Sequence, residues 1–169
     1  MTKEIPVSRG PVALVDDEDY ERLCQYRWRK VGYDTDLTNY AQGRQRNSKP
    51  PYKNVRMHRL LMDPPAGMQV DHINGNGLDN RKANLRVCCQ SENRRNISKY
   101  RTSSGRAPSS KYKGVSWDKW ARKWQAYTTI DGKMMWLGRF ATEGEAALAY
   151  NEAAAALHGD FARLNEVSP

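Results

Sequence analysis

The sequence is poor in cysteine and histidine and has no long hydrophobic run. Its 169 residues include three Cys and three His. An odd number of cysteines, with Cys88 and Cys89 adjacent, argues against a disulfide framework and favours a reducing compartment. The lack of a Cys-x-x-Cys pair disfavours zinc. No apolar run approaches the ~20 residues that cross a bilayer, and no hydrophobic signal segment follows Met1. We therefore expect a cytoplasmic protein with no membrane contact and no disulfide partner.

What the sequence has in excess is positive charge. The chain carries 28 Lys and Arg against 19 Asp and Glu, a formal net charge of +9. This balance predicts an anionic partner, with nucleic acid as the first candidate. The length suits one ordinary domain or two or three small ones, and it does not indicate an oligomeric state.

The first 62 residues are predicted to form short elements. Strands are expected at residues 12–15, 40–41 and 55, and helices at 16–26 and 56–62. The acidic residues at the start of the first helix suit the positive end of its dipole. Trp28 is expected in the core. The polar, basic stretch that follows residue 41 is expected to be a loop, which either lies along phosphate or is simply exposed.

The stretch from Val70 to Asn96 is the most informative part of the chain. Residues 68–70 predict a short strand, and the Asn-Gly pairs after it favour a tight hairpin turn. A second strand is predicted at 84–87 and a helix at 91–96. A strand, a loop, a strand and a helix in so few residues form a compact unit that carries a carboxylate, an imidazole and several amides.

Four of these side chains suit phosphodiester hydrolysis. The reaction needs a base for water and a cation for the developing charge. His72 titrates near neutral pH and suits the base. Asp71 and Asn93 offer hard oxygen ligands for one divalent ion, with Mg²⁺ or Mn²⁺ favoured. Asn84 could hold the second imidazole nitrogen and fix the tautomer.

The segment from Arg56 to Asn96 resembles the HNH endonucleases of the phage and intron-encoded homing type. The resemblance is carried by H-R, D-H-I-N-G-N-G-L-D-N-R, N-L-R and S-E-N-R-R-N, with Asn84 twelve and Asn93 twenty-one residues after His72. It implies a ββα-metal fold of the H-N-N variant that cuts a DNA phosphodiester. It also implies a base at His72, an orienting residue at Asn84 and metal ligands at the other two positions. A bacterial or phage origin fits this group.

One geometric condition limits this interpretation. Adjacent strand residues point to opposite faces, so Asp71 and His72 converge only if the strand ends or twists at His72. The alternative is a structural hairpin in which His72 merely caps a turn.

Positive charge flanks the predicted site. Residues 81–101 carry seven basic residues and one acid. Although a charge run is usually a solvated face, its place beside the predicted site favours contacts with the DNA backbone. The predicted contacts are Arg81, Lys82, Arg86, Arg94, Arg95, Lys99 and Arg101. The Ser- and Gly-rich residues 98–110 predict a linker.

The last part of the chain has a different pattern. Strands are predicted at residues 112–117, 123–130 and 133–140, with Asp131-Gly132 as a hairpin turn, and an Ala-rich helix is predicted at 142–158. Residues 111–140 carry seven basic and two acidic residues, whereas 141–169 carry one and five. The predicted sheet, and not the helix, should therefore face an anion. A sheet can enter the major groove.

Residues Lys111 to Asn165 resemble the plant apetala/ethylene-response DNA-binding domain. The resemblance is carried by Y-K-G-V, W-Q-A, W-L-G-R-F, E-A-A-L-A-Y-N-E-A-A and H-G-D-F-A-R-L-N, and it implies recognition of the major groove by the sheet. For any single tryptophan, the core of the small domain is the favoured place. The residues expected to contact DNA are Lys113, Trp117, Lys119, Arg122, Trp124 and Arg139.

The sequence as a whole predicts an α+β protein. A ββα-metal nuclease domain with N-terminal β strands (1–97) would be joined by a linker (98–110) to a three-stranded antiparallel sheet packed on one helix (111–169). The predicted function is site-directed cleavage of double-stranded DNA. The alternatives are a non-catalytic DNA-binding protein or repressor with a decayed nuclease domain, and an RNA-binding protein that stacks bases on its aromatic residues.

Overall fold

The structure is a computed structural model, and it describes residues 1–8, 11–32, 39–47, 49–51, 53–97 and 107–167. The chain divides into two compact units, Met1–Arg94 and Arg95–Pro169. Most of the predicted linker lies outside the described residues, so the predicted domain limits remain predictions. Small antiparallel sheets and helices make up both units, which confirms the α+β class.

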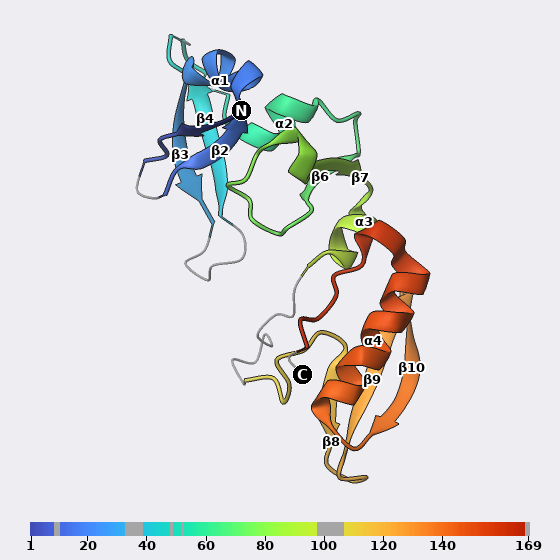
Figure 1. The fold of residues 1–169 in the computed structure, drawn as a ribbon. Coiled ribbons are helices and arrows are strands. Elements are labelled where there is room, and N and C mark those ends of the chain that lie inside the picture. The colour runs from blue at the N-terminus through green and yellow to red at the C-terminus, as the bar shows by residue number, and fades with distance from the viewer. Residues whose placement is uncertain (9–10, 33–38, 48, 52, 98–106, 168–169) are drawn as a thin grey trace. The chain divides into compact units, whose positions relative to one another are not determined.

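Short strands and one helix begin the first unit (Figure 1). These are β1 (Thr2–Ile5), β2 (Ala13–Asp16), α1 (Asp17–Cys24), β3 (Tyr26–Val31), β4 (Tyr40–Gln45) and β5 (Val55–Arg56). β1 pairs with β2, and a second antiparallel sheet has the order β3-β4-β5. Apolar residues from both sheets and from α1 share one core. Trp28 lies in this core as predicted, and its Nε1 donates to the carbonyl of Leu23 at 2.8 Å.

The strand β4 is longer than the sequence predicts. It continues through polar residues 42–45, where a loop was expected, because each of these residues pairs with β3. Backbone hydrogen bonds of a central strand do not depend on side-chain polarity.

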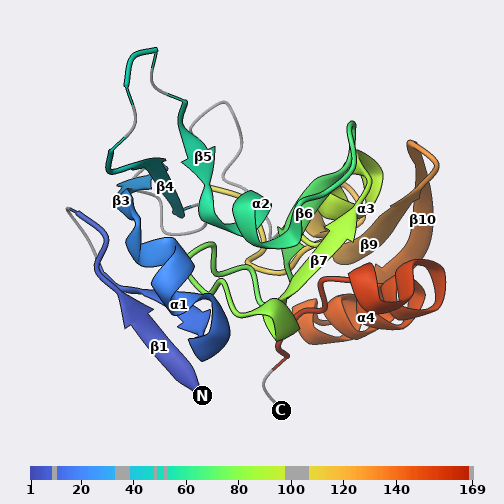
Figure 2. The same cartoon turned by 90° about the horizontal axis from the view of Figure 1, so that it is seen from above.

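The predicted strand, loop, strand and helix appear in that order in the second half of the unit (Figure 2). β6 (Gln69–His72) and β7 (Leu85–Cys88) form an antiparallel hairpin, and α3 (Gln90–Arg95) follows. The helix α2 (Met57–Met62) packs against both strands. β6 ends at His72, two residues beyond the predicted strand. The ββα-metal assignment itself remains a prediction.

The connection between β6 and β7 spans residues 73–84 and is not a single tight hairpin turn. The amides of Gly75 and Asp79 close two turns on the carbonyls of His72 and Asn76, and residues 77–80 are buried. The backbone of Leu14, on β2, donates to the carbonyl of Leu78 and accepts from the amide of Asn80, both at 2.8 Å. Leu78 joins the core of the unit. Gly77 lies so close to the chain at the start of β4 that a Cβ there would be 2.3 Å from the backbone oxygen of Asn39.

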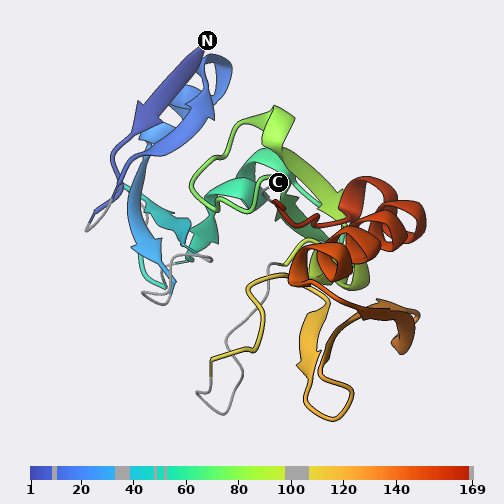
Figure 3. The same ribbon diagram turned by 60° about the horizontal axis from the view of Figure 1, so that its bottom comes forward.

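The second unit is a three-stranded antiparallel sheet with one helix against it (Figure 3). Its elements are β8 (Val115–Asp118), β9 (Lys123–Ile130), β10 (Lys133–Phe140) and α4 (Glu143–His158), and the strand order is β10-β9-β8. The bounds of β9 and β10 are those predicted. The side chain of Thr142 and that of Glu145 cap the N-terminus of α4, and Gly159 ends it. None of the helices in the described residues is long and apolar enough to span a membrane.

The strand β8 begins later than predicted. Gly114 has a φ of +72°, and a Cβ there would lie 2.1 Å from the ring of Tyr150 on α4. This close approach takes residues 112–114 out of the strand, and Tyr112 packs in the core instead.

Replacing Gly77 by Ala is expected to lower the free energy of unfolding by about 1–3 kcal/mol, because the added methyl group overlaps the backbone near β4. Urea unfolding followed by circular dichroism measures the change. The control is Gly144→Ala on α4, where the nearest contact of the new Cβ is 3.6 Å away and alanine favours the helix by roughly 0.5–1 kcal/mol. An unchanged unfolding free energy for Gly77→Ala would contradict this close packing.

Candidate active site and nucleic-acid interface

Asp71 and His72 are the last two residues of β6, and regular alternation would direct them to opposite faces of the β6–β7 hairpin. Side chains alternate along a strand, so Gln69 shares the face of Asp71, whereas Val70 shares that of His72. Arg86 is the cross-strand partner of Asp71. Its Nε and Nη2 both donate to Asp71 Oδ2, at 2.9 and 2.6 Å. The two side chains are only 15% and 7% exposed, so the predicted metal ligand is held by a shielded guanidinium.

His72 lies in a buried aromatic cluster. The centre of its ring is 5.0 Å from that of His58 and 5.8 Å from that of Tyr40, and the residue is 4% exposed. Its Nε2 lies 3.4 Å from Asn80 Oδ1. Because an amide oxygen only accepts, this contact is a hydrogen bond in the tautomer that carries the proton on Nε2, in which Nδ1 is the basic nitrogen.

The same environment sets the charge of His72. Burial lowers its pKa, and the hydrogen bond to Asn80 and the charges of Asp71 and Asp79 oppose that shift only in part. The imidazole is therefore neutral near pH 7, which is the form that can take a proton from water.

His58 packs against His72 inside the unit. It is 3% exposed, and its Nδ1 has no hydrogen-bond partner among the described residues. Burial lowers the pKa of His58 to about 3, with smaller contributions from the charges of His72 and neighbouring arginines. The neutral imidazole of His58 therefore packs directly against the ring of His72.

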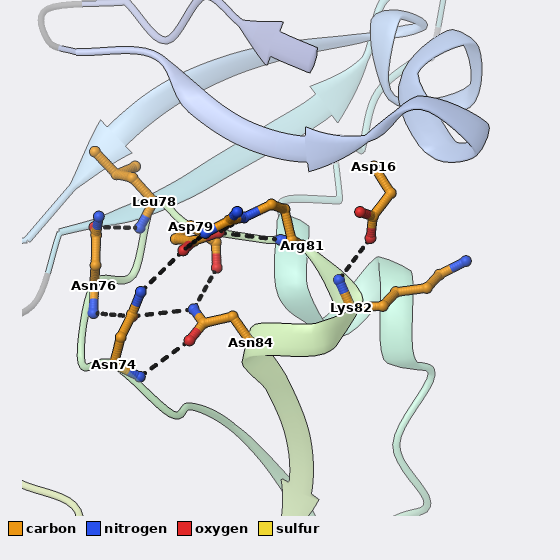
Figure 4. A network of polar contacts seen from close by, with 8 residues as sticks. All are labelled: Asp16, Asn74, Asn76, Leu78, Asp79, Arg81, Lys82 and Asn84. Carbon is orange, nitrogen blue, oxygen red and sulfur yellow. Dashed lines mark hydrogen bonds and ion pairs between the residues drawn. The ribbon is translucent and has the colours of Figure 1, made fainter. Parts of the chain in front are cut away.

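Asn84 stabilises the loop between β6 and β7 (Figure 4). Its Oδ1 accepts from the Asn74 amide at 3.0 Å, and its Nδ2 donates to Asn74 Oδ1 and to the Asp79 carbonyl at 3.0 and 2.8 Å. The Asp79 carboxylate also accepts from Asn74 Nδ2, at 2.9 Å. Asn80 follows directly in this loop. The described contacts thus connect Asn84, the predicted orienting residue, to the imidazole of His72 through the loop and Asn80.

Asn93 lies on the Asp71 side of the hairpin. Its Nδ2 donates to Gln69 Oε1 at 2.5 Å, and Gln69 shares a strand face with Asp71. In the described part of the chain, no three His, Cys, Asp or Glu side chains gather as ligands of one metal ion. The predicted ion depends instead on the Asp71 carboxylate and on amide oxygens. Such hard donors suit Mg²⁺ or Mn²⁺, so the residues fit the ion, with Arg86 as a competing cation.

The predicted site residues therefore form two groups. Asp71 and Asn93 form one group beside Gln69, and His72 lies at the last residue of β6, where the strand ends. An end of the strand at His72 is the condition under which Asp71 and His72 can converge. Asn84 directly precedes β7, and its side chain binds the loop that connects β6 to β7. Their catalytic and ligand roles remain predictions.

Two more of the predicted DNA contacts are bound to carboxylates. Arg81 Nε and Nη2 donate to the two Asp79 carboxylate oxygens, at 2.8 and 2.7 Å. Lys82 Nζ lies 2.5 Å from Glu18 Oε1 and 2.8 Å from Asp19 Oδ2. It lines a hollow with further acidic residues of α1, which is a poor surface for phosphate.

The other basic residues of this segment differ in position. Arg94 is exposed on α3, and Arg95 is half-buried. Lys99 and Arg101 lie outside the described residues. With Arg81, Lys82 and Arg86 paired, the segment presents less positive charge than its composition indicates.

The sheet of the second unit has an open face opposite α4. Val115, Ala126 and Thr128 are buried on the covered face, and alternation along the strands places their neighbours on the other side. We call this side the outer face. It consists of Ser116, Asp118, Lys123, Gln125, Tyr127, Thr129, Met134, Trp136 and Arg139.

The outer face combines aromatic surface with one oriented arginine. Trp136 is 60% exposed and lies opposite Tyr127 in the register. The guanidinium of Arg139 lies 5.9 Å from the Trp136 ring centre, and its Nε and Nη2 contact Asp118 Oδ2 at 2.9 and 2.8 Å. The residues expected from the sequence to contact DNA do not include Trp136 or Met134, although alternation counted from the Asp131-Gly132 turn places both on this face.

The two predicted tryptophan contacts differ in exposure. Trp124 packs against the core of the unit, whereas Trp117, which makes an edge contact with it at 5.1 Å between ring centres, is 37% exposed. Lys113 is also engaged, because its Nζ donates to the carbonyl of Arg95 at 2.5 Å. Burial, with a contribution from the charge of Arg163, lowers the pKa of Lys113 to about 8.

The turn between β8 and β9 projects three side chains into solvent. Lys119 and Arg122 are exposed, and Trp120 between them is 98% exposed. Asp118 Oδ1 accepts from the backbone amides of Trp120 and Ala121 at 3.0 and 3.1 Å, which fixes the shape of the turn. Lys119, Arg122 and Arg139 thus remain accessible as predicted DNA contacts.

Comparison with known families agrees with this division. The family model for HNH endonuclease matches residues 63–95, and the model for the AP2 domain matches residues 110–160. No solved structure matches the chain.

The relatives match different parts of the chain. Dehydration-responsive element-binding protein 2E of Arabidopsis thaliana is 40% identical over 67 residues, which cover 34% of this chain and 28% of the plant protein. Dehydration-responsive element-binding protein 2C of Arabidopsis thaliana is 48% identical over 56 residues, which cover 32% of this chain and 16% of the plant protein. The chain thus spans less than a third of these plant relatives. Protein 3.8 of Escherichia phage T7 is 30% identical over 129 residues, covering 69% of this chain and 92% of the phage protein.

The chain therefore combines an HNH endonuclease domain with a C-terminal AP2 DNA-binding domain, as the two resemblances predicted. It belongs to the family of Protein 3.8 of phage T7.

The free energy of unfolding is expected to fall as the pH drops from about 6.5 to about 4. The unfolded chain protonates His58 in this range, whereas the folded unit, in which the pKa of His58 is about 3, does not. Protonation of this one residue changes the free energy of unfolding by at most about 1.4 kcal/mol per pH unit. Urea unfolding across this range should give a shallower slope for His58→Phe than for the wild type. Equal slopes would contradict a buried, neutral His58.

Proposed function

We propose that this protein is a DNA endonuclease of the homing type, which hydrolyses a phosphodiester with one divalent ion and His72 as general base. The observation that carries the proposal is the end of β6. There Asp71 and His72 are adjacent, Asn80 faces the imidazole, and Asn93 lies on the Asp71 side. A relative in a phage supports a phage-type origin.

His72 has the properties that a base requires. Its Nε2 donates to Asn80, so Nδ1 takes the proton of the attacking water. Asn84 acts as a positioning residue, since it fixes the loop that holds Asn80. Because the residue is 4% exposed, cleavage requires a local opening through which the duplex reaches the ring.

Asp71 and Asn93 would hold the ion, with Gln69 as a further amide beside them. An ion bound there would supply positive charge against the scissile phosphate as charge develops on it. Arg94, exposed on α3, is available to the neighbouring backbone phosphates.

The second unit would select and hold the target. Its outer face offers Trp136, Met134 and Tyr127 to base edges and sugars, and Arg139 to an acceptor pair such as that of guanine. Lys119 and Arg122 would contact phosphate from the β8–β9 turn. Since both units are on one chain, binding by either raises the effective concentration of the other at the DNA.

The second candidate function is a DNA-binding protein without nuclease activity. One observation favours it: the carboxylate of Asp71 is neutralised by Arg86, and the imidazole of His72 is almost fully buried. A protein with a decayed nuclease site would still bind duplex DNA through its AP2 domain. A DNA-cleavage assay therefore distinguishes the two candidate functions, whereas a binding assay does not.

His72→Ala is expected to lower the cleavage of supercoiled plasmid in Mg²⁺ or Mn²⁺ by roughly 10²- to 10⁴-fold, because the general base is lost. Duplex affinity, measured by fluorescence anisotropy, should stay near that of the wild type. The matched control is His158→Ala, which removes a histidine of the second unit and should leave cleavage unchanged. Normal cleavage by His72→Ala would refute the proposed base. Wild-type binding without cleavage in either ion would favour the second candidate.

Trp136→Ala is expected to weaken duplex binding by about tenfold, since packing of an aromatic ring on a nucleotide contributes on the order of 1–3 kcal/mol. Fluorescence anisotropy at one fixed salt concentration measures the change. The control is Leu148→Ala, which removes an apolar side chain that is 57% exposed on α4. Equal losses in both variants would argue against the outer face as the DNA contact.

A further inference from the structure

Two side chains that the sequence assigns to different partners are bound to each other in this structure. Asp71 is the predicted metal ligand and Arg86 a predicted DNA contact. Arg86 Nε and Nη2 both bond to Asp71 Oδ2, at 2.9 and 2.6 Å, across the β6–β7 ladder. To bind a metal ion, Asp71 would have to release Arg86 or bind both at once. To bind DNA, Arg86 would likewise have to release Asp71 or bind both.

The pair differs from the other ion pairs near the site. Arg81 and Lys82 are bound to Asp79 and to acidic residues of α1, none of which the proposed chemistry uses. Arg86 alone among these residues holds a carboxylate that is proposed to bind the ion. The side chains of Asp71 and Arg86 are 7% and 15% exposed, so solvent screens their attraction far less than that of a surface pair.

Electrostatics then opposes an ion at Asp71 while Arg86 stays in place. A divalent cation at the carboxylate would lie within a few ångströms of a guanidinium, and like charges at that distance repel strongly in a shielded site. If Arg86 moves away, it needs another anion. A guanidinium binds phosphate oxygens with the same two-pronged geometry that it uses on a carboxylate.

We propose that Arg86 is an internal counter-cation that occupies Asp71 in the metal-free protein and transfers to a DNA phosphate when the ion binds. The inference rests on the proposed role of Asp71 as a metal ligand. Its consequence is coupling between the two ligands: DNA raises the affinity for the ion by drawing Arg86 away, and the ion raises the affinity for DNA by the same factor. The ion site is therefore weak in the absence of DNA and is completed on the substrate.

Mn²⁺ binding to the full-length protein, measured by isothermal titration calorimetry, tests this inference. The measurement uses the His72→Ala background, so that a short DNA duplex added in the second arm stays uncut. Without DNA, Arg86→Met should bind Mn²⁺ about tenfold more tightly than the parent, because the competing cation is gone. Adding the duplex should tighten Mn²⁺ binding more in the parent than in Arg86→Met. In the parent, DNA both contacts the ion and draws Arg86 away from Asp71, whereas in the variant only the direct contact between ion and phosphate remains.

Three further variants make the outcomes distinct. Arg86→Gln is also neutral and can still donate to Asp71, so it should tighten Mn²⁺ binding even if Arg86→Met fails to fold by circular dichroism. Arg81→Met removes a comparable ion pair at Asp79 and should leave Mn²⁺ affinity unchanged. Asp71→Asn should abolish binding at this site.

The outcomes separate the inference from the function on which it rests. Mn²⁺ affinity in the neutral Arg86 variants that equals or falls below that of the parent would overturn the role of Arg86. Mn²⁺ binding by Asp71→Asn that equals that of the parent would instead refute Asp71 as a ligand, whatever the Arg86 variants do.

Discussion

The candidate site depends above all on the hydrogen bonds that shape the loop between β6 and β7. Asn84 binds the loop from inside at Asn74 and at the carbonyl of Asp79, and the backbone of β2 binds it from outside at Leu78 and Asn80. Short polar side chains that replace backbone partners can make a loop rigid enough to bury. The loop places Asn80 against the imidazole of His72, so the tautomer of the proposed base depends on these contacts.

A second feature of the first unit is that three basic residues near the candidate site are paired with carboxylates. Arg81, Lys82 and Arg86 are each bound to a carboxylate, although the chain as a whole has a formal net charge of +9. Paired charges add little to the field that attracts DNA. General affinity for the polyanion must then come from other basic residues, among them the exposed Arg94 of the first unit and Lys119 and Arg122 of the second unit. The paired residues instead determine the shape and the electrostatics of the predicted metal site.

The sheet of the second unit separates its two faces by simple alternation. One face buries Val115 and Ala126 under α4, and the outer face keeps Trp136 and Met134 in solvent. Exposing large apolar side chains in this way has a cost in solubility, and proteins tolerate it mainly at binding surfaces. Arg139 lies among them with its guanidinium oriented by Asp118 and Trp136, so little side-chain freedom is lost when it binds.

Sequence alone indicated many of the local elements and both families, but not the strands β1 and β3. The strands β9 and β10, the helix α4 and the order strand, loop, strand and helix around His72 follow from periodicity and turn residues, which act over a few positions. Tertiary structure decided which side chains meet. No sequence pattern indicates that Asp71 lies opposite Arg86 or that His58 packs on His72. These outcomes depend on strand register and on contacts between distant segments, where one residue of shift exchanges the two faces.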